Sequence, residues 1–257
     1  MHISDLDLAL AGLASVGAGI INSLAGGGTL ISFPALVALG VPAVQSNVTN
    51  TVSLLPGYLA GSYAQRDDLR PQLAHARLLA AVSAVGGLVG SILLVVLPGS
   101  AFRAAVPYLI LLSCGLLAFG DRLRRFSSAH EAGLERRGRG AREVLFLGTV
   151  FLGAAYGGFF GAGLGIMLLA LLALFSAEPL TKLNALKQAL SFVINLVAAV
   201  FFLFSGKVVW TLVPVMAVGS LLGGFLGGRL VQVINADLLR RVVVVAGVAV
   251  AISFWVG

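Results

Sequence analysis

The sequence predicts an all-α polytopic membrane protein built from two homologous repeats. Residues of the types Ala, Val, Ile, Leu, Met, Phe, Trp, Tyr and Cys fill 59% of its 257 positions, and charged residues fill only 11%. The mean hydropathy is +1.03. A soluble domain carries about 25% charged residues, so this chain has too few to cover a surface that faces water. Long apolar runs and an internal repeat complete the prediction.

A transmembrane helix needs about 20 apolar residues, and eight runs approach that length. The N-terminus carries Asp5 and Asp7 where a signal peptide needs Lys or Arg, so we expect the first run to be retained. The eight long runs are 6–24, 43–63, 76–97 and 103–120 in the first half and 144–161, 183–204, 208–228 and 241–257 in the second.

The two halves repeat at an offset of 137 residues without a gap. Chance can match leucines in an apolar chain, but it does not match glycines, prolines and asparagines in one register. Two membrane units, each interrupted by glycine, are typical of a secondary transporter. The matches are Ala25-Gly26-x-Gly28 with Ala162-Gly163-x-Gly165, Pro42 and Asn47 with Pro179 and Asn184, Ser83-x-x-Gly86-Gly87-x-x-Gly90 with Ser220-x-x-Gly223-Gly224-x-x-Gly227, and Arg103 with Arg240.

Between the first two long runs of each half lies a short apolar segment, 29–40 or 166–177. As a helix each would measure about 18 Å, which is too short for about 30 Å of hydrocarbon. Both follow a glycine cluster and end just before a proline, Pro42 or Pro179. We therefore expect two half-helices of broken elements, which a membrane tolerates only where protein or a water-filled cavity surrounds the bare backbone.

These runs divide the chain into a first repeat (1–120), a linker (121–143) and a second repeat (144–257). The linker is polar and holds seven of the 17 Lys and Arg residues, so the positive-inside rule places it in the cytoplasm. If the half-helices cross, the repeats are inverted, 14 basic residues lie inside and only Arg103 and Lys207 lie outside. If they re-enter, the repeats are parallel and the basic residues divide less sharply. The count favours the inverted arrangement.

The helix after each half-helix carries a polar stripe. Lone polar residues in membrane helices often only join helices, but matched stripes beside two broken helices favour a shared cavity, and both interpretations stay open. The stripes are Asn184, Lys187, Gln188, Ser191 and Asn195 on one helical face of the second half, and Asn47, Asn50, Thr51 and Tyr58, with Ser46 and Ser53 alongside, in the first.

Lys187 lies about a turn and a half inside its apolar run, where a cation costs several kcal/mol unless it reaches water or a partner. It either snorkels to the interface or provides the counter-charge for an anion in the cavity. No acidic residue lies deep in a long run to neutralise it.

The glycine clusters, Gly26-Gly27-Gly28 and Gly161-x-Gly163-x-Gly165, either only break the helices or leave N–H groups at the positive end of each half-helix for an anion. Gly86-x-x-x-Gly90 and Gly223-x-x-x-Gly227 match the pattern of close helix contact, and we expect packing there.

The runs Ala25-Gly26-Gly27-Gly28-Thr29 through Pro34 and Ser46-Asn47-Val48-Thr49-Asn50-Thr51 resemble the first-half signature of the sulfite exporter TauE/SafE family. Gly161-Ala162-Gly163-Leu164-Gly165 and Leu183-Asn184-Ala185-Leu186-Lys187 resemble its second-half signature. The resemblance covers nearly the whole chain. It implies a multi-pass permease of the inner membrane, with eight spans that arose by duplication, for sulfite, sulfoacetate, other organosulfonates or related sulfur anions.

Two features depart from the family pattern. The linker is unusually rich in arginine. The segment Ile166-Met167-Leu168-Leu169 after the second glycine cluster has no counterpart of Pro34, so we do not expect strict symmetry of the two half-sites.

The sequence therefore predicts a secondary transporter for a small anion, working by alternating access of two repeats. In this hypothesis glycine N–H groups and amide and hydroxyl side chains bind the oxygens of the anion, and Lys187 provides charge. The predicted substrate-binding residues are Gly26, Gly27, Gly28, Asn47, Thr49, Asn50, Thr51, Gly163, Gly165, Asn184, Lys187, Gln188 and Ser191.

An anion channel on the same scaffold and a membrane accessory protein without transport stay open as alternatives, and a homo-oligomer is compatible with the sequence. An enzyme is not expected, because His2, His75 and His130 lie outside the long runs and no His-Glu-x-x-His motif occurs. We expect no cofactor, no metal and no nucleic-acid partner: the single Cys114 cannot form an intrachain disulfide, and no basic stripe with interleaved aromatic residues is present. The expected partners are the small anion and the lipid bilayer.

Overall fold

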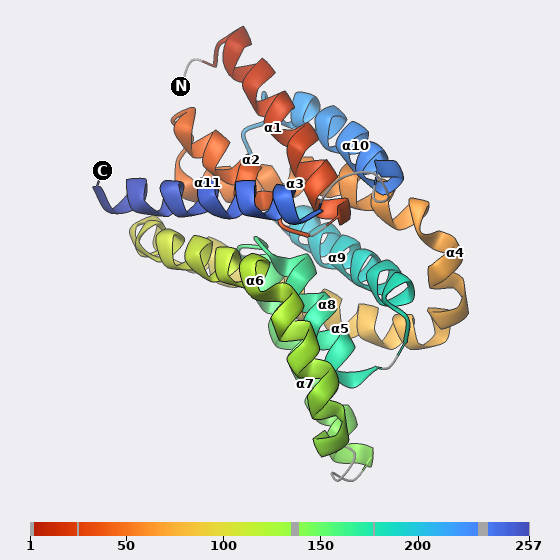
Figure 1. The fold of residues 1–257 in the computed structure, drawn as a ribbon. Helices are drawn as coiled ribbons and strands as arrows, with labels where there is room; N and C mark the ends of the chain where they lie inside the picture. The colour runs from red at the N-terminus through yellow and green to blue at the C-terminus, as the bar shows by residue number, and fades with distance from the viewer. Residues whose placement is uncertain (1–2, 25, 135–138, 177, 231–235, 257) are drawn as a thin grey trace.

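The computed structural model describes residues 3–24, 26–134, 139–176, 178–230 and 236–256, and all regular secondary structure in these ranges is helical (Figure 1). The all-α prediction is therefore confirmed. The helices are α1 (Asp5–Leu24), α2 (Thr29–Ala38), α3 (Ala43–Ala64), α4 (Arg66–Leu69), η1 (Arg70–Gln72), α5 (Leu73–Val96), α6 (Gly99–Leu134), α7 (Arg139–Phe159), α8 (Leu164–Phe175), α9 (Leu180–Leu203), α10 (Val213–Leu230) and α11 (Ala236–Val256).

Each predicted long run coincides with a long helix, and the two short runs form the short helices α2 and α8 of 10 and 12 residues. Within the described residues, four helices are long and apolar enough to span a bilayer: Asp5–Ser23, Ala76–Val96, Gly99–Phe119 and Leu180–Leu203. The polar stripe of α3 lowers the hydropathy of that helix. The chain is therefore a multi-pass membrane protein, and the number of eight spans stays a prediction.

The region between the halves is more helical than its polar composition suggests. α6 continues to Leu134 and α7 begins at Arg139, so helix covers most of 121–143. Ala, Leu, Glu and Arg, which recur there, are good helix formers. The side chains of 120–139, and with them six of the seven linker arginines, lie outside the described residues, as do those of Arg229 and Arg240. The assignment of 121–143 as a linker stays a prediction.

The two halves of the chain pack into one another. α1 packs along α10, α5 packs along α7, and α3 contacts both α10 and α9 (Figure 1). The offset of 137 residues relates α1 to α7 and α10 to α5. The contact of α1 with α10 thus has its counterpart in the contact of α7 with α5, and each half contributes one helix to each pair.

Glycines allow these helices to approach closely. A methyl group on Gly86 of α5 would lie 2.6 Å from the carbonyl oxygen of Phe151 in α7. A methyl group on Gly227 of α10 would lie 2.8 Å from Cα of Ile20 in α1. The predicted role of both small-xxx-small motifs in helix packing is confirmed, because larger residues would push the backbones apart.

α3 and α9 run in opposite directions. At one end of the pair, Asn184 near the start of α9 donates to Gln65 Oε1 just after α3, at 2.6 Å. At the other end, the N–H of Val209 beyond α9 donates to Thr49 Oγ1 near the start of α3, at 2.9 Å. We call the first end, which holds Arg66, Arg70, Arg142 and Lys182, the basic end, and the second, which holds Arg103 and Lys207, the opposite end.

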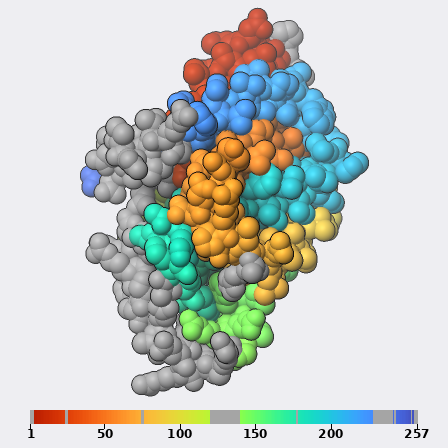
Figure 2. All heavy atoms as spheres, turned by 90° about the vertical axis from the view of Figure 1, so that its right-hand side faces the viewer, coloured from red at the N-terminus to blue at the C-terminus, as the bar shows by residue number. Residues whose placement is uncertain are grey.

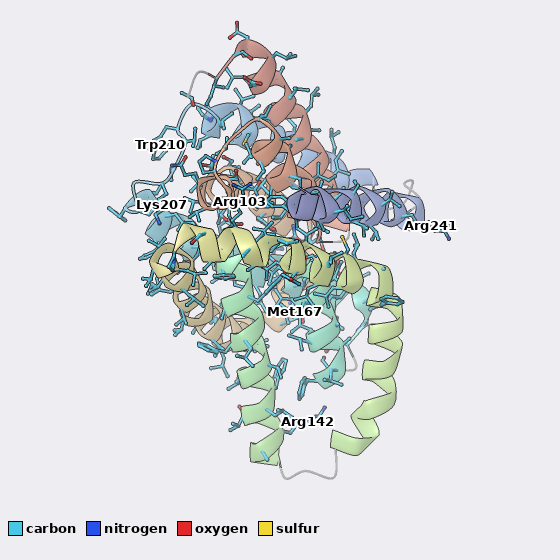
Figure 3. The ribbon with its side chains drawn as sticks, turned by 90° about the vertical axis from the view of Figure 1, so that its left-hand side faces the viewer. Arg103, Arg142, Met167, Lys207, Trp210 and Arg241 are labelled. Atoms are coloured by element: carbon cyan, nitrogen blue, oxygen red, sulfur yellow. The ribbon has the colours of Figure 1, made fainter. Side chains whose placement is uncertain are left out.

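Figure 3 shows Arg103, Lys207 and Trp210 gathered on one side of the molecule, away from Arg142, with Met167 of α8 between them. These basic residues form two separate groups, and the inverted arrangement of the repeats stays a prediction. Which end faces the cytoplasm stays a prediction.

Replacing Gly90 with Ala should destabilise the fold by about 1–3 kcal/mol, because the added methyl group meets the carbonyl of Ala155 in α7 and the helices have to separate. The same replacement at Gly115 of α6 has no atom within 4 Å of the new methyl group. It should leave stability unchanged or raise it slightly through helix propensity. Thermal unfolding of the purified variants in detergent measures both, and equal effects would contradict the packing described.

Candidate functional site

Two glycines turn the chain into the short helices. Gly26 has φ 76° and Gly163 has φ 71°, and the two positions are 137 residues apart. Glycine adopts this left-handed conformation without steric cost. Gly26 lies between α1 and α2, and Gly163 lies between α7 and α8. Both glycines are buried, so α2 and α8 begin inside the protein.

The N-terminal ends of α2 and α8 touch. The N–H of Gly165 donates to the carbonyl oxygen of Gly26 at 3.3 Å, and a methyl group on Gly165 would lie 2.6 Å from Gly26 Cα. From this contact α2 runs to the opposite end, where Leu36 packs with Leu212, and α8 runs to the basic end, where the carbonyl of Phe175 accepts from Arg142. Two helix N-termini, each with partial positive charge, therefore meet in the interior.

Aromatic and hydroxyl side chains hold the second glycine cluster in place. Phe33 of α2 contacts the ring of Phe160 edge-on, with centroids 5.3 Å apart. The carbonyl of Ala162 accepts from Ser113 at 2.9 Å and from Tyr156 at 2.7 Å. Ser113 and Tyr156 are not predicted from the sequence, since a single hydroxyl in an apolar run gives no pattern.

Three of the five predicted glycine N–H groups already have acceptors within the protein. Those of Gly26 and Gly165 donate to the carbonyls of Ile21 and Gly26, and that of Gly28 donates to Asn22 Oδ1 at 2.7 Å. Within the described ranges, the N–H groups of Gly27 and Gly163 have no acceptor. These two N–H groups are therefore the ones that a ligand can use.

Lys187 lies beside the contact of the two helix ends. It is 1% exposed, and it is the only buried Lys, Arg, Asp, Glu or His among residues with described side chains. A methyl group on Gly165 would lie 3.4 Å from Lys187 Cδ. No hydrogen bond or ion pair to its ammonium group is present among the described residues. This burial contradicts snorkelling to the interface, and a cation so placed calls for a partner.

Two asparagines of α3 reach the segments next to the glycine clusters. Asn47 donates to the carbonyl of Phe159, the last residue of α7, at 2.9 Å. Asn50 donates to Thr29 Oγ1, at the start of α2, at 3.5 Å. The Oδ1 atoms of both, the side-chain amide of Gln188 and the hydroxyl of Ser191 are buried without a partner among the described residues. The Gln188 amide lies against Gly61 of α3, well along that helix from Asn47. Buried polar atoms usually have partners, so each of these groups is a candidate contact for a polar ligand.

Three predicted residues are engaged elsewhere. The hydroxyl of Thr49 accepts from Val209 at the opposite end, and the amide of Asn184 donates to Gln65 at the basic end. The hydroxyl of Thr51 donates to the carbonyl of Asn47 in its own helix. The helical pattern of the sequence correctly places these residues on α3 and α9, but it does not predict which groups their side chains bind.

A neutral polar network connects α3, α9 and α1. The Tyr58 hydroxyl lies near the side chains of Asn195 and Asn22, and Asn22 Oδ1 accepts from the N–H of Gly28. Sequence analysis did not find Asn22, because the register of the repeat places Phe159 at its counterpart. Among the described residues, the interior thus combines a buried lysine, N–H groups without acceptors and neutral amides, which are groups that can bind anions.

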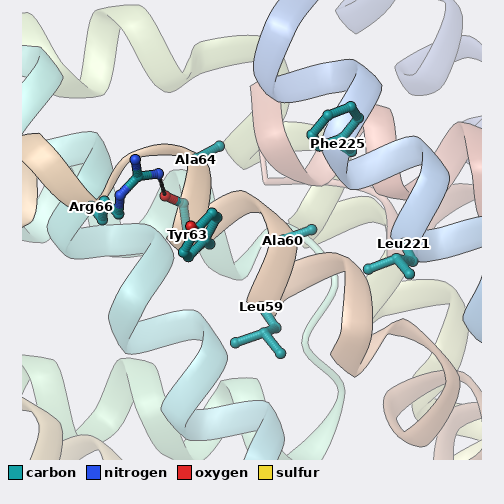
Figure 4. A pocket seen from close by; sticks show the side chains of 7 residues that line it. All are labelled: Leu59, Ala60, Tyr63, Ala64, Arg66, Leu221 and Phe225. Carbon is teal, nitrogen blue, oxygen red and sulfur yellow. Dashed lines mark hydrogen bonds between the residues drawn. The ribbon is translucent and has the colours of Figure 1, made fainter.

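A surface groove of about 670 Å³ lies between α3 and α10 (Figure 4). Figure 2 shows this face, with α3 in orange beside α10 in blue. Leu59, Leu221 and Phe225 line the groove, and the Arg66 guanidinium lies 4.4 Å from the centre of the Tyr63 ring at its edge. None of the predicted binding residues lines it, and its exposed apolar side chains are those of a lipid-facing surface.

Comparison with known proteins agrees with this architecture. The family model described as "Sulfite exporter TauE/SafE" matches residues 11–254. "Probable membrane transporter protein ORF9" of Sinorhizobium sp is 30% identical over 95% of this chain and 91% of its own length. "Probable membrane transporter protein" of Haemophilus influenzae is 33% identical over 89% and 86%, and "Probable membrane transporter protein YfcA" of Escherichia coli K12 is 27% identical over 95% and 87%. No solved structure matches the chain.

Replacing Gly26 with Ala should destabilise the protein more than replacing Gly40 with Ala. Both glycines have positive φ, 76° and 83°, so both variants carry the same backbone strain. Only at Gly26 does the new methyl group also meet the backbone of Gly165, whereas Gly40 has no atom within 4 Å. The difference should exceed about 1 kcal/mol. Chemical denaturation in detergent measures it, and equal losses would show that the two helix ends do not touch.

Proposed function

Because this chain belongs to the sulfite exporter TauE/SafE family of membrane transporters, we propose that it carries a small sulfur oxyanion or organosulfonate across the inner membrane by alternating access of its two halves. The proposal depends above all on Lys187, a buried cation that lies against the ends of two half-helices and has no carboxylate partner among the described residues. The family places the chain among transporters, and this residue motivates the choice of an anion.

The charge balance supports an anionic substrate. An isolated ammonium in a low-dielectric interior costs several kcal/mol, and a bound anion offsets that cost. The partial positive charges of the α2 and α8 N-termini add to the attraction. Asn22 and Tyr58, which extend the network, carry no charge and do not compete for the ammonium.

Donors without partners are available in the interior for the oxygens of a sulfonate or sulfite. Gly27 and Gly163 have N–H groups without acceptors in the described ranges, and Gln188 and Ser191 have donors without partners there. Asn47 and Asn50 each use one hydrogen bond, and an amide nitrogen has two N–H groups. In the proposal these residues bind oxygens, whereas Gly26, Gly28 and Gly165 give the helix ends their shape.

The arrangement of the halves supports the proposal of alternating access. The contact of α1 with α10 matches the contact of α7 with α5, its equivalent under the repeat. α3 and α9, which the repeat also relates, run in opposite directions, as in inverted repeats. The proposed site lies where the two halves meet. A movement of one half against the other would expose it to the basic end and the opposite end in turn.

Replacing Lys187 with Gln should lower the flux of a sulfonate into proteoliposomes by at least about tenfold, since a charge-assisted hydrogen bond contributes about 1.5–3 kcal/mol. Lys207→Gln is the matched control: Lys207 donates to the carbonyl of Val95 at the opposite end, and its loss should leave flux near the parent level. Normal flux in Lys187→Gln, in protein that unfolds at the parent temperature, would remove Lys187 from the mechanism.

Binding should also appear as thermal stabilisation of the purified protein. A ligand at one hundred times its Kd stabilises the folded state by about 2.7 kcal/mol. Sulfite, organosulfonates and carboxylates form the panel, and we expect the largest shift in unfolding temperature from a sulfur oxyanion. Lys187→Gln should abolish that shift while Lys207→Gln keeps it. An equal response of both variants would place the anion elsewhere.

A further inference from the structure

The basic end contains a cavity of about 400 Å³ whose lining includes Leu186, the chain neighbour of Lys187. Its mouth carries exposed and half-exposed polar groups, and its inner wall is apolar and buried. Pro71, Gln72, Glu178 and Lys182 lie at the mouth, and Leu183 and Leu186 form the inner wall.

The inner wall is formed by residues that neighbour Lys187 in α9. Leu183 and Leu186 are 2% and 3% exposed, and Lys187 follows them on the same turn of α9. Leu183 and Lys187 are four residues apart and therefore share a helical face. The cavity therefore ends at leucines that neighbour Lys187 in α9.

The counterpart positions at the opposite end are joined by a hydrogen bond. The offset of 137 residues relates Leu186 to Thr49 and Gln72 to Val209. There the Val209 N–H donates to Thr49 Oγ1 at 2.9 Å. Leu36 and Met216 are fully buried beside them, in the apolar cluster that also contains Val209. Positions that the repeat relates to one another therefore line a cavity at the basic end but form a hydrogen bond at the opposite end.

We propose that the cavity at the basic end is the entry site for the anion, and that the hydrogen bond between Val209 and Thr49 holds the opposite exit closed. This inference rests on the proposed function and adds the route to the site. Lys182 at the mouth pairs with Glu178 at 2.9 Å, but both side chains are partly exposed. Such pairs contribute little stability, so Lys182 can exchange its partner for an entering anion.

The route is tested by thiol labelling in a chain whose single cysteine, Cys114, is replaced by Ala. Leu186→Cys probes the inner wall of the cavity, and Met216→Cys probes the closed end. The reagent is (2-sulfonatoethyl) methanethiosulfonate, which itself carries a sulfonate. We expect it to modify Leu186→Cys from the side of the basic end at least about tenfold faster than Met216→Cys from either side, because a thiol without a cavity reacts only through rare opening.

Two further measurements decide the roles of charge and closure. Adding Lys182→Gln should slow the sulfonate reagent at Leu186→Cys several-fold but not its trimethylammonium analogue. Adding Thr49→Val, which removes the acceptor of Val209, should speed labelling of Met216→Cys from the opposite end. The control Thr149→Val removes a hydroxyl that bonds only within α7 and should not change that labelling.

Equal labelling of Leu186→Cys and Met216→Cys, or labelling of Leu186→Cys that saturating methanesulfonate does not slow, would overturn the entry site even where flux is normal. Failure of the proposed function gives a different result: the parent protein then transports no sulfur anion in proteoliposomes, and neither reagent is preferred at the cavity.

Discussion

The backbone contact between Gly26 and Gly165 brings the N-termini of two short helices together inside the protein, and the rest of the buried polar structure is arranged around it. In the proposed function, these two positive helix ends and the buried Lys187 together attract an anion. Apolar packing of long helices provides the frame that holds these ends in place. Side chains larger than that of glycine at this contact would push α2 and α8 apart. Lys187 would then lose its position beside the two helix ends.

The sequence was a good guide to the backbone. Short runs after glycine clusters predicted α2 and α8 to within two residues at most boundaries, because a break in apolar length is a strong constraint in a bilayer. Gly26 and Gly163 match in the sequence and also share a left-handed conformation, and Pro42 and Pro179 precede α3 and α9 with almost the same φ and ψ. The polar composition of 121–143 does not reveal that much of this segment is helical. Its helix-forming residues extend α6 well beyond the apolar run.

Side-chain partners were harder to predict. Lys187, Asn47 and Asn50 lie beside the helix ends as expected, but Thr49 and Asn184 turn to partners at opposite ends of the molecule. Helical periodicity gives the face of a residue and not the atom that approaches it from another helix. Asn22 illustrates the same limit: it caps Gly28 from within α1, and its counterpart in the repeat is a phenylalanine. The halves are therefore related in outline and different in detail, as the lack of a counterpart for Pro34 predicts.

The most direct test of a site between the helix ends is to locate a bound anion by the anomalous scattering of bromine in crystals grown with 4-bromobenzenesulfonate. The account predicts density for the sulfonate within about 4 Å of Lys187 Nζ, the range of a charge-assisted contact, with N–H groups of Gly27 or Gly163 toward its oxygens. Density confined to the protein surface, with the lysine extended into the lipid, would contradict it.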